Sequence, residues 1–296
     1  MGNLTDYIHW RGDLSFSTDP FNEVDNAALC LLSYVNFDRL LPLVGNSFLT
    51  LKELCSHFFD RYTEQELEQD KTSTGFAPFL MKEMAQSVRF QEILVGNYVN
   101  YIEPGRSLQM SAITVLLPDG TIFIAFRGTD NRILSWKEDF FLAAGEVSAQ
   151  IEAVRYLNAV GRKYPEKQIR VGGHSKGGHM AVYAAANCDA DIRERIVKIY
   201  NNDGPGFRSE FLESPEYKSV YDRIYRIIPE KSVVGMLLED RSEPIIVKGT
   251  GKGIMQHNGM SWQVLGNRFE RVDRLNDTSV TFDAAMTNWL ENFDDD

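Results

Sequence analysis

Between residues 121 and 203, short apolar strand patterns alternate with helical patterns. Buried strands are expected at 121–126, 168–172 and 196–201, and helices at 147–164 and 176–187. Strands separated by helices of this length pair in parallel, because a parallel connection needs a crossover that runs over a face of the sheet. The alternation predicts an α/β fold with a mostly parallel central sheet and helices on both faces.

Further patterns flank this region. Strands are expected at 91–101, 110–117, 223–228 and 244–247, and an amphipathic helix at 278–293. The first ninety residues read as helical or irregular, with helices expected at 49–62 and from a cap at Asp25 to Phe37. We therefore expect an N-terminal helical extension, residues 1–90, that packs on a catalytic core of residues 91–296.

Composition excludes several classes of protein. The 296 residues are 43% hydrophobic with only 10 Pro, so apolar burial can offset the entropy of folding, and a disordered or collagen-like chain is excluded. Lys and Arg number 31 against 42 Asp and Glu, and the net charge of −11 disfavours nucleic acid and anionic membrane surfaces as partners. No apolar run approaches the roughly 20 residues of a transmembrane helix. We expect no cofactor and no metal.

The amino terminus and the cysteines indicate a cytoplasmic protein. Met1–Asp6 is polar and lacks the basic and apolar regions of a secretory signal. Cys30, Cys55 and Cys188 each lie in an apolar stretch, and three cysteines cannot all pair. Free thiols in a reducing compartment are expected, and the oligomeric state is left open.

One motif carries chemistry. Residues 173–177 read Gly-His-Ser-Lys-Gly, which matches G-x-S-x-G and stands between an apolar strand and a helix. This is the setting of a nucleophile elbow, where a tight, strained turn presents the serine at the sheet edge. Ser175 is the predicted nucleophile, and the amino end of the next helix supplies positive potential where an oxyanion would form. A glycine-rich turn with an incidental serine is the alternative.

A serine nucleophile needs a base, and the chain has five histidines. His257 lies on a polar loop after the last expected strand, where the chain order nucleophile, acid, histidine of elbow-type hydrolases puts the base. His9 and His57 precede the sheet. His174 should turn away from the serine hydroxyl, and His179 should pack or cap locally. His257 is therefore the predicted base.

Asp203 is the predicted acid. It follows the strand at 196–201, one helix and one strand after Ser175, and Gly204-Pro205-Gly206 then turns the chain. This order places its carboxylate at the sheet edge beside the nucleophile. An Asx turn is the everyday use of such an aspartate. The competing carboxylates, which follow the next strand, are Glu230, Glu239 and Asp240.

An oxyanion needs two N–H donors that point at one spot. Lys176, directly after the nucleophile, should supply one from its backbone. Thr129 should supply the other, because it follows the strand at 121–126 and Gly128 lets the backbone approach closely.

The stretches I-A-F-R-G-T (124–129) and S-W-K-E-D-F (135–140) resemble the FRGT…W…D pattern of class 3, fungal-type lipases. With the elbow and the late His257, the match spans about residues 110–265. The combination of G-H-S-K-G-G, N-N-D-G-P-G-F and Q-H-x-x-x-x-W is similar to a bacterial family of uncharacterised lipase-like α/β hydrolases. The resemblance implies an α/β-hydrolase fold with Ser175 as nucleophile, His257 as base and Thr129 in the oxyanion hole.

The chain departs from the class 3 lipases at one position. Those lipases carry their acid in a D-x-V-P segment, and the matching segment here, K-S-V-V-G, has Ser232 in place of the Asp. Three readings follow: Asp203 supplies the carboxylate one strand earlier, Glu230 substitutes, or the serine and histidine work without a carboxylate.

The expected reaction is hydrolysis of a carboxylic ester, from a small molecule or a lipid, through an acyl-enzyme. A peptidase or acyltransferase would use the same residues. A catalytically impaired scaffold that binds a partner is the other alternative, and Ser232 is the feature that favours it. Residues 133–136, 207–221 and 236–238 are candidate walls of the substrate site or, equally, parts of the core.

Overall fold

The computed structural model describes residues 2–41, 48–69, 72, 74–103, 108–128 and 146–276. Thr129, the candidate wall at 133–136 and the helix expected at 278–293 lie outside these ranges.

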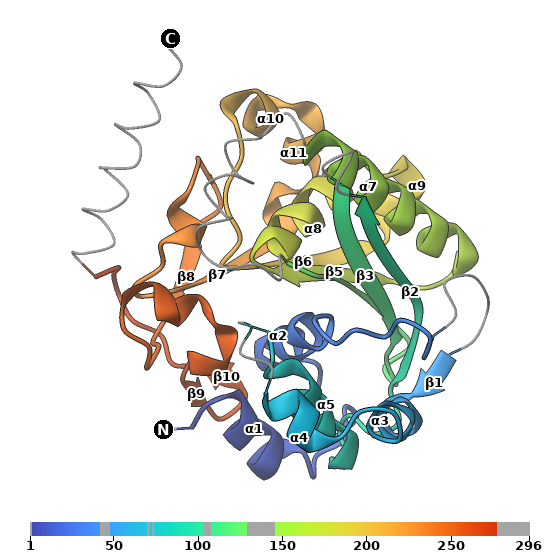
Figure 1. Cartoon of the computed structure of the whole chain (residues 1–296). Helices are drawn as coiled ribbons and strands as arrows, with labels where there is room; N and C mark the ends of the chain where they lie inside the picture. The colour runs from blue at the N-terminus through green and yellow to red at the C-terminus, as the bar shows by residue number, and fades with distance from the viewer. Residues whose placement is uncertain are drawn as a thin grey trace.

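An eight-stranded sheet forms the centre of the described part, with its strands in the order of the sequence (Figure 1). The strands are β1 (Phe48–Thr50), β2 (Leu94–Glu103), β3 (Leu108–Leu116), β4 (Ile122–Phe126), β5 (Ile169–His174), β6 (Ile196–Asn202), β7 (Ile224–Pro229) and β8 (Pro244–Val247). Strands β1 to β4 pair antiparallel, and β4 to β8 pair in parallel. A separate two-stranded sheet joins β9 (Val264–Leu265) to β10 (Arg268–Phe269). The predicted α/β fold is confirmed.

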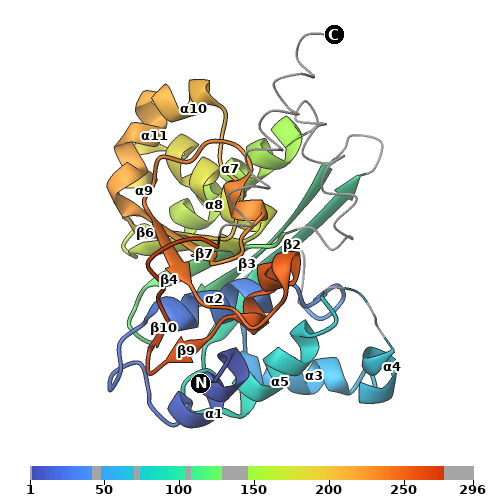
Figure 2. The ribbon, with the colours of Figure 1, turned by 90° about the vertical axis from the view of Figure 1, so that its left-hand side faces the viewer.

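Helices cover both faces of the sheet (Figures 1 and 2). On one face lie α7 (Glu146–Lys163), α8 (Lys176–Asn187), α9 (Ala190–Glu194), α10 (Ser209–Glu213) and α11 (Pro215–Val220). On the other lie α1 (Leu4–Arg11), α2 (Glu23–Leu32), α3 (Leu51–Phe59), α4 (Glu64–Glu68) and α5 (Ala77–Gln86). Strand β4 is apolar throughout because it is buried on both sides: Ile122, Ile124 and Phe126 face one core, and Phe123 and Ala125 face the other.

Each expected strand is present within three residues of its predicted ends. The helix expected at 49–62 is wrong at its start, because residues 48–50 form the edge strand β1 and Thr50 then caps α3. A three-residue strand is too short to show alternation. Helix α2 begins earlier than predicted, since Asn22 is its N-cap and Asp25 completes the capping box three residues on, and it ends at Leu32, before the predicted Phe37.

The first ninety residues share a core with the sheet. All ten residues of α2 are buried, and the helix packs on β4 and β5. Side chains of α1, α3 and α5 join the same apolar cluster as Phe123 and Tyr200 of the sheet. The segment at 207–221 also belongs to a core, because Phe207, Leu212 and Tyr217 are buried against α8 and its neighbours.

Two other expectations concern the cysteines and membrane-spanning helices. Cys30, Cys55 and Cys188 are all buried and unpaired. Among the described residues, no helix combines the length and apolar character that crossing a bilayer requires.

Candidate functional site

Ser175 lies on the strained turn that the motif predicts. It links β5 to α8 with φ 60° and ψ −136°, a backbone conformation that L-residues rarely adopt. A Cβ at Gly173 would lie 2.1 Å from the Gly177 backbone, and one at Gly177 would lie 2.1 Å from the Phe126 carbonyl oxygen. Both positions therefore exclude every other residue. Within the described residues of α8, the Ser175 hydroxyl makes no capping hydrogen bond.

Asp203 leaves the neighbouring strand at the same level. His174 of β5 pairs with Asn202 of β6, so Ser175 and Asp203 each follow the last pair of two adjacent parallel strands. The Ser175 N–H donates to the Asn202 carbonyl at 3.0 Å. The Asp203 side chain is fully buried, and its φ of 51° turns the chain away from the sheet. The sheet register thus brings the predicted nucleophile and acid to one edge.

His257 lies at the end of a 3₁₀ helix, η4 (Gly253–His257), and contacts Asp203 directly. Its Nδ1–H donates to Asp203 Oδ2 at 2.7 Å. Because Nδ1 carries the proton, the basic nitrogen of the neutral ring is Nε2. The structure therefore brings the predicted base and the predicted acid together, at the end of the strand next to the one that carries Ser175.

Ser232 contacts the other oxygen of the same carboxylate. Its hydroxyl donates to Asp203 Oδ1 at 2.5 Å, and the Gly235 N–H donates to that oxygen at 3.1 Å. Three hydrogen bonds, from His257, Ser232 and Gly235, thus hold the buried carboxylate in place. The residue that departs from the class 3 lipase pattern supports an acid on the preceding strand.

The competing carboxylates are engaged elsewhere. Glu230 accepts from the Gln256 side chain at 3.3 Å, and Glu239 accepts from the Ser209 hydroxyl at 3.2 Å. Asp240 forms an ion pair with Arg226 at 3.4 Å.

A second histidine lies against the predicted base. The rings of His174 and His257 are 4.5 Å apart, centroid to centroid, and His174 Nε2–H donates to the His257 backbone carbonyl at 2.7 Å. The Tyr34 hydroxyl lies 2.9 Å from His174 Nδ1. Burial, aided by the neighbouring His257, lowers the pKa of His174 to about 3, so its ring is neutral.

Helix α2 and the residues after it contribute contacts that sequence reasoning missed. Asn26 exchanges side-chain hydrogen bonds with Asn202, at 2.9 and 3.2 Å, and Asn202 also donates to the Gly173 carbonyl at 3.0 Å. Cys30 contacts both amides. Asn26, Cys30 and Tyr34 recur every four residues, the spacing of one helix face. Asn26 is a polar residue in a helix that is buried along its whole length. A polar side chain at such a position could have indicated these contacts.

The loop after β4 runs beside the elbow. A Cβ on Gly128 would lie 3.0 Å from the Ser175 Cβ and 2.7 Å from the His174 carbonyl oxygen. Thr129 is the next residue along the chain, outside the described ranges. Lys176 is the first residue of α8, so its backbone N–H belongs to the amino end of that helix.

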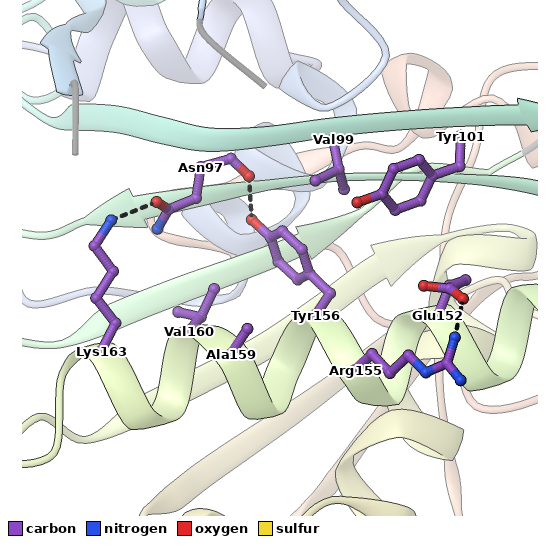
Figure 3. A pocket seen from close by; sticks show the side chains of 9 residues that line it. All are labelled: Asn97, Val99, Tyr101, Glu152, Arg155, Tyr156, Ala159, Val160 and Lys163. Atoms are coloured by element: carbon purple, nitrogen blue, oxygen red, sulfur yellow. Dashed lines mark hydrogen bonds and ion pairs between the residues drawn. The ribbon is translucent and has the colours of Figure 1, made fainter. Parts of the chain in front are cut away.

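His179 packs locally, as predicted: Nδ1–H donates to the Gly206 carbonyl at 3.0 Å, and the ring stacks on Phe207. A cavity of about 300 Å³ opens elsewhere, between β2 and α7, with Tyr156 and Lys163 among its walls (Figure 3). Ser175, Asp203 and His257, all of which the structure describes, are not among the residues that line it.

Ser232→Ala tests the support of the acid. Loss of a hydrogen bond to a buried charge should lower the free energy of unfolding by about 1–3 kcal/mol and kcat for ester hydrolysis about 10-fold. Ser242→Ala is the control, because Ser242 is also a buried serine and donates to a carboxylate, that of Asp240, at 2.5 Å. It should cost similar stability and leave kcat unchanged. Equal kcat in the two variants would show that Ser232 does not support the acid.

Comparison with known proteins adds the family. The Mbeg1-like family model matches residues 84–296, which is 213 of the 296 residues. The mono- and diacylglycerol lipase of Aspergillus oryzae is 14% identical with a TM-score of 0.50, over 92% of this chain and 87% of that one. A variant of MDLA from Penicillium cyclopium is 14% identical with a TM-score of 0.50, over 88% of each chain.

The Rhizomucor miehei lipase propeptide complex, at 18% identity and a TM-score of 0.40, aligns with 56% of this chain and 64% of its own. That match spans less than two thirds of the relative's length. No protein with a curated description matches the chain. At these identities the structural likeness shows the fold, and it confirms the α/β-hydrolase architecture shared with lipases. The chain belongs to the Mbeg1-like family.

Proposed function

We propose that this protein is a serine hydrolase that cleaves carboxylic esters. The observation that carries the proposal is the 2.7 Å hydrogen bond from His257 Nδ1 to the buried Asp203 carboxylate, beside a serine on a strained strand–helix turn. The carboxylate holds the tautomer whose Nε2 accepts a proton, and that tautomer is the one a general base for Ser175 requires.

In the proposed first step, Ser175 Oγ attacks the ester carbonyl while His257 Nε2 takes the hydroxyl proton. The Lys176 and Thr129 backbone N–H groups hold the oxyanion of the tetrahedral intermediate. Nε2 then returns the proton to the leaving alcohol, and an acyl-enzyme remains. Water then attacks the acyl-enzyme carbonyl while His257 Nε2 takes its proton, Ser175 Oγ leaves and regains a proton from Nε2, and the carboxylic acid is released. Asp203 stabilises the imidazolium in both halves of the reaction.

A small-molecule or lipid ester is the substrate class that the site and fold support. The mono- and diacylglycerol lipase of Aspergillus oryzae carries the word lipase in its name, and the structural match covers 92% of this chain. The scaffold alternative depended on Ser232, and the hydrogen bond from Ser232 to Asp203 supports a working acid instead.

A fluorescent phosphonate probe that reacts with activated serines tests the proposal. One adduct per chain is expected near neutral pH, on the peptide that contains Ser175, because only a deprotonated hydroxyl attacks phosphorus readily. Labelling should be lost in Ser175→Ala and kept in Ser219→Ala, which alters an exposed serine. Absence of labelling in the wild-type protein would favour the scaffold. p-Nitrophenyl esters of graded chain length, beside a peptide substrate, separate esterase from peptidase.

A further inference from the structure

We propose that Tyr34 and His174 are positioning residues that fix His257 in its working orientation. The inference rests on the proposed function, because it assigns His257 the part of general base. It concerns a chain of contacts that begins just after α2, in a region without a recognised motif, and ends on the backbone of the base.

Three contacts with described residues hold His257, and His174 supplies two of them. Asp203 accepts from Nδ1, His174 Nε2–H donates to the His257 carbonyl at 2.7 Å, and the two rings lie 4.5 Å apart at 35°. The carbonyl contact anchors the end of η4, from which the imidazole projects. Because His174 and Ser175 share a peptide bond, the anchor of the base and the nucleophile move as one unit.

Tyr34 supports the tautomer of His174 that the His257 carbonyl requires, with the proton on Nε2. Its hydroxyl lies 2.9 Å from Nδ1 and 3.4 Å from the His174 carbonyl oxygen, and it has one hydrogen to give. If the hydroxyl donates to Nδ1, the proton of the neutral ring stays on Nε2, where the His257 carbonyl needs it. The opposite tautomer would set a lone pair of Nε2 against that carbonyl oxygen.

The neutral state of His174 suits this task. Burial and the neighbouring His257 lower the pKa of His174 to about 3. When His257 becomes an imidazolium during the reaction, the ring stacked on it therefore carries no charge, and like-charge repulsion is avoided. A positively charged neighbour at the same place would oppose proton transfer to the base.

Two substitutions of one residue separate anchoring from general packing. The amide nitrogen of glutamine ends where Nε2 of histidine ends, so His174→Gln keeps a donor for the His257 carbonyl. The shorter amide of His174→Asn stops at the level of Nδ1 and loses that donor. We expect the rate constant of phosphonate labelling to fall about 10- to 100-fold in His174→Asn and to stay within about threefold of wild type in His174→Gln. Tyr34→Phe should lower the rate constant of labelling about 2- to 10-fold, the effect expected from the loss of one hydrogen bond.

The second readout does not depend on turnover. The His257 Nδ1–H proton, hydrogen-bonded to Asp203, gives a far-downfield resonance in the proton NMR spectrum. This resonance should broaden or shift in His174→Asn and Tyr34→Phe and should be retained in His174→Gln. With an ester substrate, His174→Asn and Tyr34→Phe should lower kcat and leave KM unchanged, because they displace the base and not the substrate.

His179→Asn is the matched control. His179 is equally buried, uses both ring nitrogens and stacks on an aromatic ring, but its partners are Gly206, Gln150 and Phe207. It should leave labelling and the resonance unchanged. Wild-type labelling and an unchanged resonance in His174→Asn and Tyr34→Phe would overturn the inference. If the wild-type protein is not labelled at all, the proposed function fails, and the resonance alone decides whether these two residues position His257.

Discussion

Replacing Asp203 with asparagine is expected to lower kcat for ester hydrolysis about 10³- to 10⁴-fold. The Ser232 hydroxyl and the Gly235 N–H both donate to Oδ1, so the asparagine carbonyl oxygen should take that place. Its NH₂ group would then face His257 Nδ1 and favour the tautomer that is protonated on Nε2, which cannot accept the Ser175 proton. Steady-state kinetics with a p-nitrophenyl ester would measure the loss, and KM should change little.

Glu230→Gln is the control for this prediction. Glu230 is the carboxylate that would substitute for Asp203, but its side chain contacts Gln256. We expect kcat of Glu230→Gln within about threefold of wild type, since the Glu230 side chain contacts Gln256 and the carboxylate that His257 contacts is Asp203. The opposite result, a collapse in Glu230→Gln with a normal rate in Asp203→Asn, would move the acid to Glu230.

Replacing Arg89 with methionine should lower the free energy of unfolding at pH 7 by about 3–5 kcal/mol. Arg89 and Asp25 are both fully buried, and their side chains are joined by hydrogen bonds of 2.5 and 2.7 Å. Arg89 also donates to the carbonyls of Asp19 and Leu14. Removal of the guanidinium leaves a buried carboxylate without its counter-charge. Urea denaturation of the two proteins would measure the difference.

The deficit should grow with pH. Burial raises the pKa of Asp25, and the hydrogen bonds and charge of Arg89 oppose that rise. Without Arg89 the folded-state pKa rises further above the unfolded value of about 3.9. Such a carboxyl is neutral in both states at low pH, so the loss of stability is small there and increases as pH rises through the folded-state pKa.

Two further variants check the cause. Asp25→Asn added to Arg89→Met removes the orphaned charge and should recover part of the lost stability at pH 7. Arg155→Met breaks the exposed pair with Glu152 and should change the free energy of unfolding by less than about 0.5 kcal/mol. A pH-independent deficit in Arg89→Met would show that packing, not the charge of Asp25, causes the loss.

The parts of the fold that follow from local patterns could be predicted from the sequence. Strands β4 to β8 are short apolar runs, and the carboxyl ends of adjacent parallel strands meet at one edge, so Ser175 and Asp203 could be placed together before their contacts were known. Position in the chain also made His257 the candidate base, and the structure places it in contact with Asp203. Strand β1 was missed because three residues show no period.

The support of the site could not be predicted, because its contacts join distant segments without a local signal. Tyr34 and His174 are 140 residues apart. Neither the four-residue spacing of Tyr34 from Cys30 nor the elbow motif around His174 predicts that their side chains meet. In the sequence, Ser232 stands where the class 3 lipases have their acid. Its position in that motif does not indicate which carboxylate its hydroxyl contacts. Only the arrangement of the loops after β6 and β7 shows that it donates to Asp203.

The reciprocal hydrogen bonds between the Asn26 and Asn202 side chains bear on the smallest fragment of the chain that could function. The family match starts at residue 84, yet the groups that brace the turn from behind are at positions 26, 30 and 34. A fragment cut at that boundary would keep Ser175, Asp203 and His257, the residues of the proposed triad, and would lose the side chains of α2 and Tyr34 that contact the turn from behind. The apolar underside of the sheet, stripped of α2, would face water, so we expect residues 84–296 to need the segment before them in order to fold stably.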